Sequence, residues 1–600
     1  MYAVVRAFTG CQDERGPRAL SPGGSTGPEE KVRSRRSGFA VPVPALVSIL
    51  VVACSPAKAS VLQVEPKGSD RPNILLIVVD DMGYSDLGSF GGEIETPNLD
   101  RLAYEGIRFS NFHTSTMCSP SRAMLLTGVD SHRAGFGNML EELAPNQKGK
   151  PGYEGHLNDR VVTLPTLLRD AGYRTYMTGK WHLGSGNGRG PAWHGFDHSF
   201  ALETGGASHF ADMQPAYAPT PESKANYSED GVRLEALPDD FHYSSQYYVD
   251  RMIAYLDTNA GTDKPFFAYL AFTAPHWPLQ APDQAIARQR GHYDDGYDAL
   301  AAARLARQKE LGLLPQNAVR SGRSPKEKPW KDLGPAQRKV EIRTMEVYAA
   351  MVDEVDRHVG RLIDFLESRG ELDDTAIIFI SDNGPEGHDL DETWPMESFP
   401  DIRKTIDTTH DFSYAAMGRP GSYVLYGPSW ANAVSPAFRL HKGFPTEGGT
   451  HVAAFARYPG FIDSPRITDE FVFITDVTPT ILALAGIRHP GDEYHRRTIE
   501  PLVGRSFLPL LRGERLDNAA RVTAVELLGK RAIRKGDWKI MHMPVPYGTG
   551  DWQLFNLAED LAESTDLASD NPDETTALRK AWHQYAEQNG VIIPDWVSGY

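Results

Sequence analysis

Short apolar runs alternate with amphipathic stretches along most of the chain beyond residue 70. The runs at 73–79, 173–177, 266–272 and 375–380 are rich in β-branched and aromatic residues, which is typical of strands buried on both faces. Within 341–366, apolar side chains recur every three or four positions, as on one face of a helix. This alternation predicts an α/β fold, with a large and mainly parallel sheet sandwiched by helices.

The C-terminal part of the chain has a different pattern. Strand-like pieces at 521–528 and 538–542 precede a helical pattern around 574–587. We therefore expect a small C-terminal α+β domain at 516–600, after a large domain at 72–515.

Three long stretches show no clear period, and we expect them to be irregular binding loops that wall a cleft. They lie at 185–235, 283–339 and 385–444. The last stretch is rich in Gly, Pro and aromatic residues, and its rings are candidates for a wall that accepts an aryl group. The alternative is that these rings only pack the loop. The rings are those of Tyr423, Tyr426 and Trp430.

The first 59 residues have the pattern of a leader with a signal peptide. An apolar stretch at 39–54 follows several arginines and precedes the small-residue series A-K-A, as in exported proteins. We expect cleavage near residue 59, a linker at 60–71, and export to the periplasm or the medium. Residues 51–54 also resemble a bacterial lipobox, which would make Cys54 a lipidated N-terminus and is the alternative to a soluble product.

Composition narrows the functional classes. Apolar residues make up 40% of the chain and charged residues 24%, which are globular proportions. The net charge of −17 disfavours nucleic acid and anionic lipid as partners, so we expect no nucleic acid, and membrane contact only if Cys54 is lipidated. Cysteines occur at 11, 54 and 118, too few for a disulfide scaffold, and only Cys118 lies beyond the leader.

Residues 118–128, with the sequence CSPSRAMLLTG, place that cysteine beside a Ser-Pro helix start. Cys118 should therefore lie at a helix N-terminus, where unpaired backbone N–H groups favour an anionic or hydrogen-bonding group. Arg122 comes one turn later on the same face. The alternative is a buried structural cysteine.

Two pairs of oxygen-bearing side chains follow predicted strands. Asp80 and Asp81 follow the run at 73–79, while Asp382 and Asn383 follow the run at 375–380. In a parallel sheet both pairs would open onto the carboxyl edge, where ligands bind. Hard oxygen ligands suit Ca²⁺ or Mg²⁺, and a site this rich in protein oxygens suits Ca²⁺ better. Either pair alone is more often a helix cap or a turn.

Further candidate residues are polar groups near other strand ends. Lys180 and His182 lie at i and i+2, which at the end of a strand point the same way. His276 follows the run at 266–272, and Lys442 lies in H-K-G before E-G-G. Singly, each is more often a solvated or packed side chain, and we expect His441 to be structural.

Together these segments resemble the signature of the type I sulfatases, which depend on formylglycine and belong to the alkaline-phosphatase-like superfamily. The long insertions look like the bacterial arylsulfatase branch. The resemblance implies an alkaline-phosphatase-like fold and a Cys118 that a maturation enzyme oxidises to formylglycine. It implies catalytic roles and one bound Ca²⁺. The catalytic set is Cys118, Arg122, Lys180, His182, His276, Asp382 and Lys442, and the metal set is Asp80, Asp81, Asp382, Asn383 and Cys118.

The predicted function is that of an arylsulfatase, which hydrolyses a small-molecule sulfate monoester to an alcohol or phenol and sulfate. In the mechanism that the resemblance implies, the formylglycine hydrate attacks sulfur, Lys180 binds sulfate, and His276 protonates the leaving oxygen. His182 then accepts a proton as sulfate leaves. The alternatives are a phosphonate monoester or phosphodiester hydrolase of the same superfamily, and a secreted binding protein in which Cys118 is never matured.

Overall fold

The structure is a computed structural model that describes residues 71–186, 188–258 and 261–596. The predicted leader, Cys54 and most of the linker lie outside the described residues. None of the helices in the described part combines the length and apolarity that a membrane span requires.

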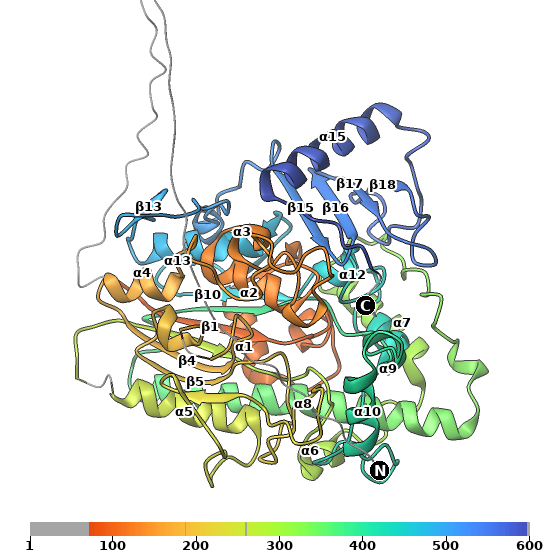
Figure 1. Ribbon diagram of the computed structural model, residues 1–600, viewed down its shortest axis with the longest axis horizontal. Helices are drawn as coiled ribbons and strands as arrows, with labels where there is room; N and C mark the ends of the chain where they lie inside the picture. Colours follow the sequence, from red (N-terminus) through yellow and green to blue (C-terminus); the bar gives the residue numbers. More distant parts are fainter. Residues whose placement is uncertain (1–70, 187, 259–260, 597–600) are drawn as a thin grey trace, which may run out of the picture. The chain divides into compact units, whose positions relative to one another are not determined.

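Ten strands form one sheet in the order β11-β2-β10-β9-β1-β8-β4-β5-β6-β7. The five strands β9, β1, β8, β4 and β5 are adjacent and parallel (Figure 1). Their bounds are Thr375–Ser381, Asn73–Val79, Phe266–Ala271, Arg174–Lys180 and His198–Leu202. The outer strands are β11 (Arg466–Thr468), β2 (Ile107–Phe109), β10 (Ala454–Arg457), β6 (Tyr227–Glu229) and β7 (Val232–Arg233). The prediction of a mainly parallel central sheet is confirmed.

Helices cover both faces of this sheet because side chains alternate along each buried strand. In β1, Leu75 and Ile77 belong to one apolar cluster, and Ile74 and Leu76 belong to another. The first cluster includes α1 (Pro97–Glu105), α5 (Ser244–Thr258) and α8 (Pro335–Ser368). The second includes α2 (Cys118–Thr127), α4 (Leu164–Asp170) and α13 (Val477–Leu484). In Figure 1, α5 and α8 lie below the sheet and α2, α4 and α13 lie above it, which confirms the sandwich.

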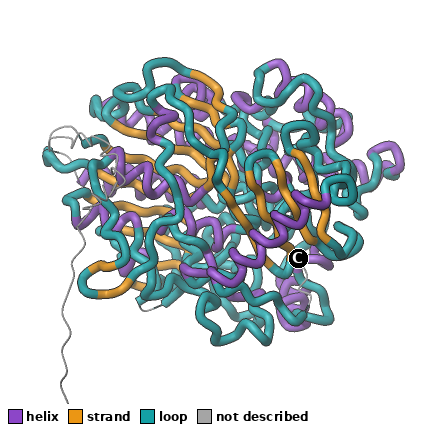
Figure 2. The backbone as a smooth tube through the Cα atoms, turned by 90° about the horizontal axis from the view of Figure 1, so that it is seen from above, coloured by secondary structure: helices purple, strands orange, loops and turns teal. Residues whose placement is uncertain are grey.

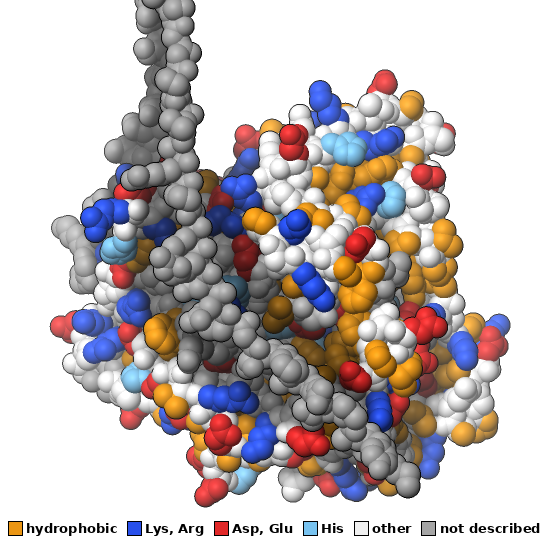
Figure 3. All heavy atoms as spheres, viewed as in Figure 1, with side chains coloured by type: hydrophobic (Ala, Val, Ile, Leu, Met, Phe, Trp, Pro, Cys, Tyr) orange, Lys and Arg blue, Asp and Glu red, His pale blue; other side chains and the backbone are white. Residues whose placement is uncertain are grey.

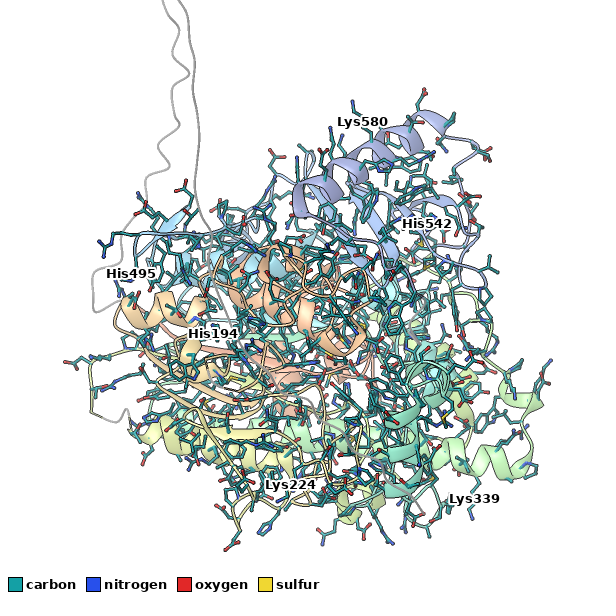
Figure 4. The ribbon with its side chains drawn as sticks, viewed as in Figure 1. His194, Lys224, Lys339, His495, His542 and Lys580 are labelled. Carbon is teal, nitrogen blue, oxygen red and sulfur yellow. The ribbon has the colours of Figure 1, made fainter. Side chains whose placement is uncertain are left out.

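The C-terminal residues form a second, antiparallel sheet of four strands with one long helix. The strands are β15 (Val522–Leu527), β16 (Lys530–Lys535), β17 (Trp538–His542) and β18 (Trp552–Asn556), and the helix is α15 (Pro572–Asn589). Leu578 and Trp582 of α15 pack on one face of the sheet, and Lys580 lies on the exposed side of the helix (Figures 2 and 4). The other face, including Met541 and Phe555, packs into the apolar cluster of α2.

The remaining short elements connect these layers. They are β3 (Phe112–His113) paired with β12 (Val472–Phe473), β13 (Glu493–Tyr494) paired with β14 (Arg497–Thr498), and the helices α3 (Ser131–Ala134), α12 (Glu447–Thr450) and α14 (Leu508–Leu511). On the face of the molecule shown in Figure 3, acidic and basic side chains are interspersed.

The expectation of irregular loops at 283–339 and 385–444 is wrong, since both stretches contain helices. They hold α6 (Asp283–Arg288), α7 (Gly296–Glu310), α9 (Leu390–Thr393), α10 (Pro400–Thr409) and α11 (Gly427–Val434). One reason is that α7 buries a charged residue on its inner face. Arg304 is 1% exposed and forms ion pairs with Asp86 and Glu93, so the apolar period of the helix is broken by a residue that is nevertheless inside. The stretch at 185–235 likewise contains β5, β6 and β7.

Gly179 lets β4 approach its neighbour β8 directly before Lys180. Its φ is 110°, and a Cβ there would lie 1.8 Å from the carbonyl oxygen of Ala271. We expect Gly179→Ala to lower the free energy of unfolding by about 1–3 kcal/mol for the dihedral strain and a further ~1–3 kcal/mol for the clash. The matched control is Gly172→Ala, which has a φ of 94° but no atom within 4 Å, so it carries the strain alone. Urea unfolding that gives equal losses for the two variants would contradict this account.

Candidate active site

The candidate site lies at the carboxyl edge of four adjacent parallel strands. Asp80 and Asp81 directly follow β1, and Asp382 and Asn383 directly follow β9. The side-chain Nδ2 of Asn383 donates to Oδ1 of Asp81 at 2.6 Å, so the two pairs meet as the sequence predicts. Lys180 is the last residue of β4.

Three buried carboxylates at this edge are each paired with a buried cation. The ion pairs are Lys180–Asp80 at 2.6 Å, Lys442–Asp81 at 2.9 Å and Arg122–Asp382 at 2.8 Å. All six side chains are at most 1% exposed. Because an unpaired charge is very costly in such surroundings, removing any one partner would destabilise the site strongly. Arg122 also donates to the backbone oxygen of Lys180 at 2.8 Å, which ties α2 to the end of β4.

The oxygen atoms of this cluster fit a divalent cation. Among the described residues, Oδ1 of Asp80 and Oδ1 of Asn383 are buried without a hydrogen-bond partner. The ligand atoms of Asp80, Asp81 and Cys118 lie within 4.8 Å of one another, and a ring nitrogen of His276, predicted to be the leaving-group acid, lies within the same distance of each. Burial raises the pKa of Asp81 to about 6, and the neighbouring Glu386 and Asp382 act in the same direction. A hard cation would satisfy the free oxygens and keep the carboxylates ionised.

Cys118 is the first residue of α2, as predicted, and it is 2% exposed. Burial raises the pKa of its thiol to about 12, although Lys180 and Lys442 oppose that shift. The thiol would therefore remain protonated at neutral pH, and an unmodified Cys118 would be a poor nucleophile.

A small pocket opens over Cys118. Three other predicted residues line it with the cysteine, namely His182, His276 and Lys442. Its remaining wall includes Glu141 and three aromatic side chains that the sequence did not single out as a wall, namely Tyr217, Trp277 and Trp394. The centroids of the Tyr217 and Trp394 rings lie 4.9 Å apart, and those of Tyr217 and Trp277 lie 6.1 Å apart. The pocket thus combines cationic and imidazole groups with an aromatic wall.

The model of the family described as Sulfatase matches residues 72–487, more than half of the chain. The chain belongs to the sulfatase family. It is therefore a sulfuric ester hydrolase, as the sequence predicted. The chain is 43% identical to an uncharacterised sulfatase of Schizosaccharomyces pombe over 540 residues, which cover 88% of the chain and 96% of that protein. It is 40% identical to an arylsulfatase of Klebsiella aerogenes over 439 residues, 73% of the chain and 91% of the relative.

Solved structures support the alkaline-phosphatase-like fold of this sulfatase. Ps i-CgsB, solved in complex with k-i-k-neocarrahexaose, has a TM-score of 0.60 at 24% identity and covers 88% of the sulfatase and 95% of its own chain. A phosphonate monoester hydrolase of Agrobacterium radiobacter has a TM-score of 0.50 at 20% identity, with 86% and 95% covered. At these identities the likeness concerns the fold alone.

The rings that the sequence suggested as an aryl wall do not line the pocket of the sulfatase. Trp430 is fully buried against Tyr293 and Tyr297, and Tyr426 stacks on another tyrosine. Tyr423 does not line the pocket either, but it packs behind the pocket wall: its ring centroid lies 5.7 Å from that of Trp277, and its hydroxyl donates to a backbone oxygen at 3.0 Å. The expectation is wrong for these rings, because aromatic composition does not distinguish a core ring from a pocket ring.

His182 lines the pocket of the sulfatase, but not because of the strand alternation that the sequence suggested. Strand β4 ends at Lys180, and His182 has a positive φ of 53°, so strand alternation does not bring the two side chains together. Asp81 also has a positive φ, of 68°. Such conformations are uncommon for residues with a Cβ, and they concentrate at functional sites.

Two acidic residues of the site were missed. Oε2 of Glu386 lies 3.3 Å from Nζ of Lys442, so this lysine is held between Glu386 and Asp81. Burial opposes ionisation, but Lys442 and His388 hold the pKa of Glu386 below its ordinary range. The position of Glu386, three residues beyond Asn383, could have indicated it. Glu141 lies in a connecting turn with no motif around it.

Proposed function

We propose that this sulfatase is an arylsulfatase that acts through formylglycine at position 118 and one bound Ca²⁺. The single observation that carries the aryl preference is the pocket over Cys118, whose wall contains Tyr217, Trp277 and Trp394. Aromatic rings stabilise a bound aryl group by offset or edge contacts as well as by burial. The similarity to the Klebsiella aerogenes arylsulfatase supports the same substrate class.

The burial of residue 118 supports the assignment of formylglycine at this position. As an aldehyde hydrate, the residue would present two hydroxyl groups in place of a protonated thiol. One hydroxyl, deprotonated with help from Asp382, attacks sulfur, and the bond between sulfur and the ester oxygen breaks. His276, with Lys442 beside it, supplies the proton to the departing phenol or alcohol. Arg122 holds the hydrate in place from one turn further along α2.

In this proposal the two buried lysines bind the sulfuryl group. Lys180 and Lys442 are both fully buried and lie at the carboxyl edge of the sheet, so their positive charges act in a poorly screened environment. They would neutralise the sulfuryl oxygens as charge develops in the transition state.

Four side chains, Asp80, Asp81, Asp382 and Asn383, would hold the Ca²⁺ together with an oxygen of residue 118. When bound, the ion supplies positive charge that favours the deprotonated hydroxyl and offsets the charge of the sulfate. The metal site and the two lysines together suit a singly charged sulfate monoester, whereas a phosphate monoester carries close to two charges and is usually served by two metals.

The leader and the maturation of Cys118 belong to the same proposal. Export would place the enzyme in the periplasm or the medium, with a lipid anchor only if Cys54 is modified. Conversion of Cys118 requires a formylglycine-generating enzyme as a partner, and the substrate is a small-molecule sulfate ester. A binding protein with the same fold would lack the aldehyde and turnover.

If Trp394 contacts the aryl group of the substrate, its replacement should impair the hydrolysis of aryl sulfates more than that of alkyl sulfates. We expect Trp394→Leu to lower kcat/KM for nitrophenyl sulfate about two- to tenfold, consistent with about 0.5–1.5 kcal/mol for one aromatic contact, and to leave an alkyl sulfate nearly unchanged. Trp193→Leu is a surface control for the loss of an indole ring, because that ring is 63% exposed, against 1% for Trp394, and does not line the pocket.

The same assay should include a nitrophenyl phenylphosphonate and a bis-nitrophenyl phosphate. A tenfold or greater preference for either, about 1.4 kcal/mol in transition-state free energy, would overturn the sulfatase substrate in favour of the alternative hydrolase. If Trp394→Leu lowers kcat/KM equally for aryl and alkyl sulfates, the aryl preference is wrong, but the assignment as a sulfatase stands.

Removal of calcium should lower both activity and thermal stability. An ion that binds only the folded protein stabilises it by about 2.7 kcal/mol at a concentration of 100 Kd, so chelation should lower the Tm measurably. Added Ca²⁺ should restore activity and Tm together, and elemental analysis should find one calcium per chain. Stoichiometric zinc, with activity restored by zinc but not by calcium, would contradict the metal assignment.

A further inference from the structure

Glu141 contacts the imidazole of His182 on the wall of the pocket. It lies in a single 3₁₀ turn, Leu140–Glu142, and its Oε1 is 3.3 Å from Nε2 of His182. The hydroxyl of Tyr217 donates to the same oxygen at 2.7 Å. Glu141 thus contacts both Tyr217 and His182 through the same oxygen. All three side chains line the pocket that contains Cys118.

This contact selects one tautomer of His182. Burial raises the pKa of Glu141, but the hydrogen bond with His182 lowers it to about 2. The carboxylate is therefore ionised and can only accept a hydrogen bond. Nε2 of His182 must then carry the hydrogen, which leaves the lone pair on Nδ1 in the neutral ring. Within the described residues, Nδ1 of His182 is buried and has no hydrogen-bond partner.

The ring is also held by close packing. A Cβ on Gly205 would lie 2.7 Å from Cε1 and 2.9 Å from Nε2 of His182, and 2.1 Å from the hydroxyl oxygen of Tyr217. The absence of a side chain at position 205 thus lets the backbone close against both groups. This packing limits how far the imidazole can turn toward Gly205.

We propose that Glu141 is a positioning residue for the release of sulfate, because it fixes His182 with Nδ1 as the free acceptor. This inference rests on the proposed function. After attack on sulfur, residue 118 carries one sulfate ester and one free hydroxyl. Nδ1 of His182 takes the proton of that hydroxyl, and its O–H electron pair forms the C=O bond. The C–O bond to sulfate breaks and its electron pair leaves with sulfate, which restores the aldehyde.

The test is Glu141→Gln in enzyme that carries formylglycine, assayed with nitrophenyl sulfate. The variant keeps the size of the side chain but loses its charge. We expect kcat to fall tenfold or more, short of the about 10²–10⁴-fold expected for loss of the base itself. Because only the second step is slowed, the first turnover should still release nitrophenol as a fast burst. The peptide that contains residue 118 should gain the mass of one sulfate during turnover.

Two further variants are needed: Tyr217→Phe as a milder perturbation of Glu141, and Glu154→Gln as a control. Tyr217→Phe keeps the ring but removes one hydrogen bond to Glu141, so it should show the same accumulation to a smaller extent. Glu154→Gln is the matched control, since the side chain of Glu154 is 23% exposed against 16% for Glu141 and it lies outside the pocket. This control should keep the activity of the wild type and accumulate no sulfated peptide.

The outcomes separate this inference from the proposed function. His182→Ala should accumulate sulfated residue 118; if it does and folded Glu141→Gln and Tyr217→Phe do not, the positioning role is wrong and the proposed function stands. If Glu141→Gln does not fold, Tyr217→Phe decides alone. If no variant and no quenched wild-type sample ever carries sulfate on residue 118, the covalent mechanism itself is contradicted.

Discussion

The pairing of three buried carboxylates with three buried cations is the interaction on which the rest of the site depends. Asp80, Asp81 and Asp382 stand at the ends of two adjacent strands, where no solvent screens their mutual repulsion. Their partners arrive from α2, from the end of β4 and from the loop before α12, so elements far apart in the sequence must meet there. A buried ion pair adds little net stability, but it penalises any arrangement that separates the partners.

The apolar packing around the sheet gives these charges a fixed frame. Strand β1 is buried on both faces, and α2, which begins with Cys118, is buried along its whole length. The second sheet, β15–β18, adds apolar side chains to the same cluster as α2 and so supports the helix that begins with Cys118. The raised pKa of the Cys118 thiol follows from this burial, and it is the reason an unmodified cysteine would serve poorly there.

Strands buried on both faces could be predicted from the sequence, because their apolar runs are short and rich in β-branched and aromatic residues, which favours a strand over a buried helix segment. Strands β1 and β17 have the predicted bounds, and Cys118 begins a helix as expected. Residues that act through spatial neighbours could not be found in this way. Arg304 interrupts the apolar face of α7, and Glu141 and Tyr217 come from connecting segments 76 residues apart that carry no motif. Ring composition likewise did not separate the core Trp430 from the pocket Trp394.

The central claim is that turnover belongs to an aldehyde at position 118 within this charged frame. The most direct measurement compares preparations that differ in the degree of maturation, with the fraction of aldehyde in the peptide around residue 118 quantified by mass spectrometry. We expect activity per mole of enzyme to rise in proportion to that fraction, on a line through the origin, while the temperature of thermal unfolding stays the same. Full activity in a preparation whose residue 118 is entirely unmodified cysteine would contradict it.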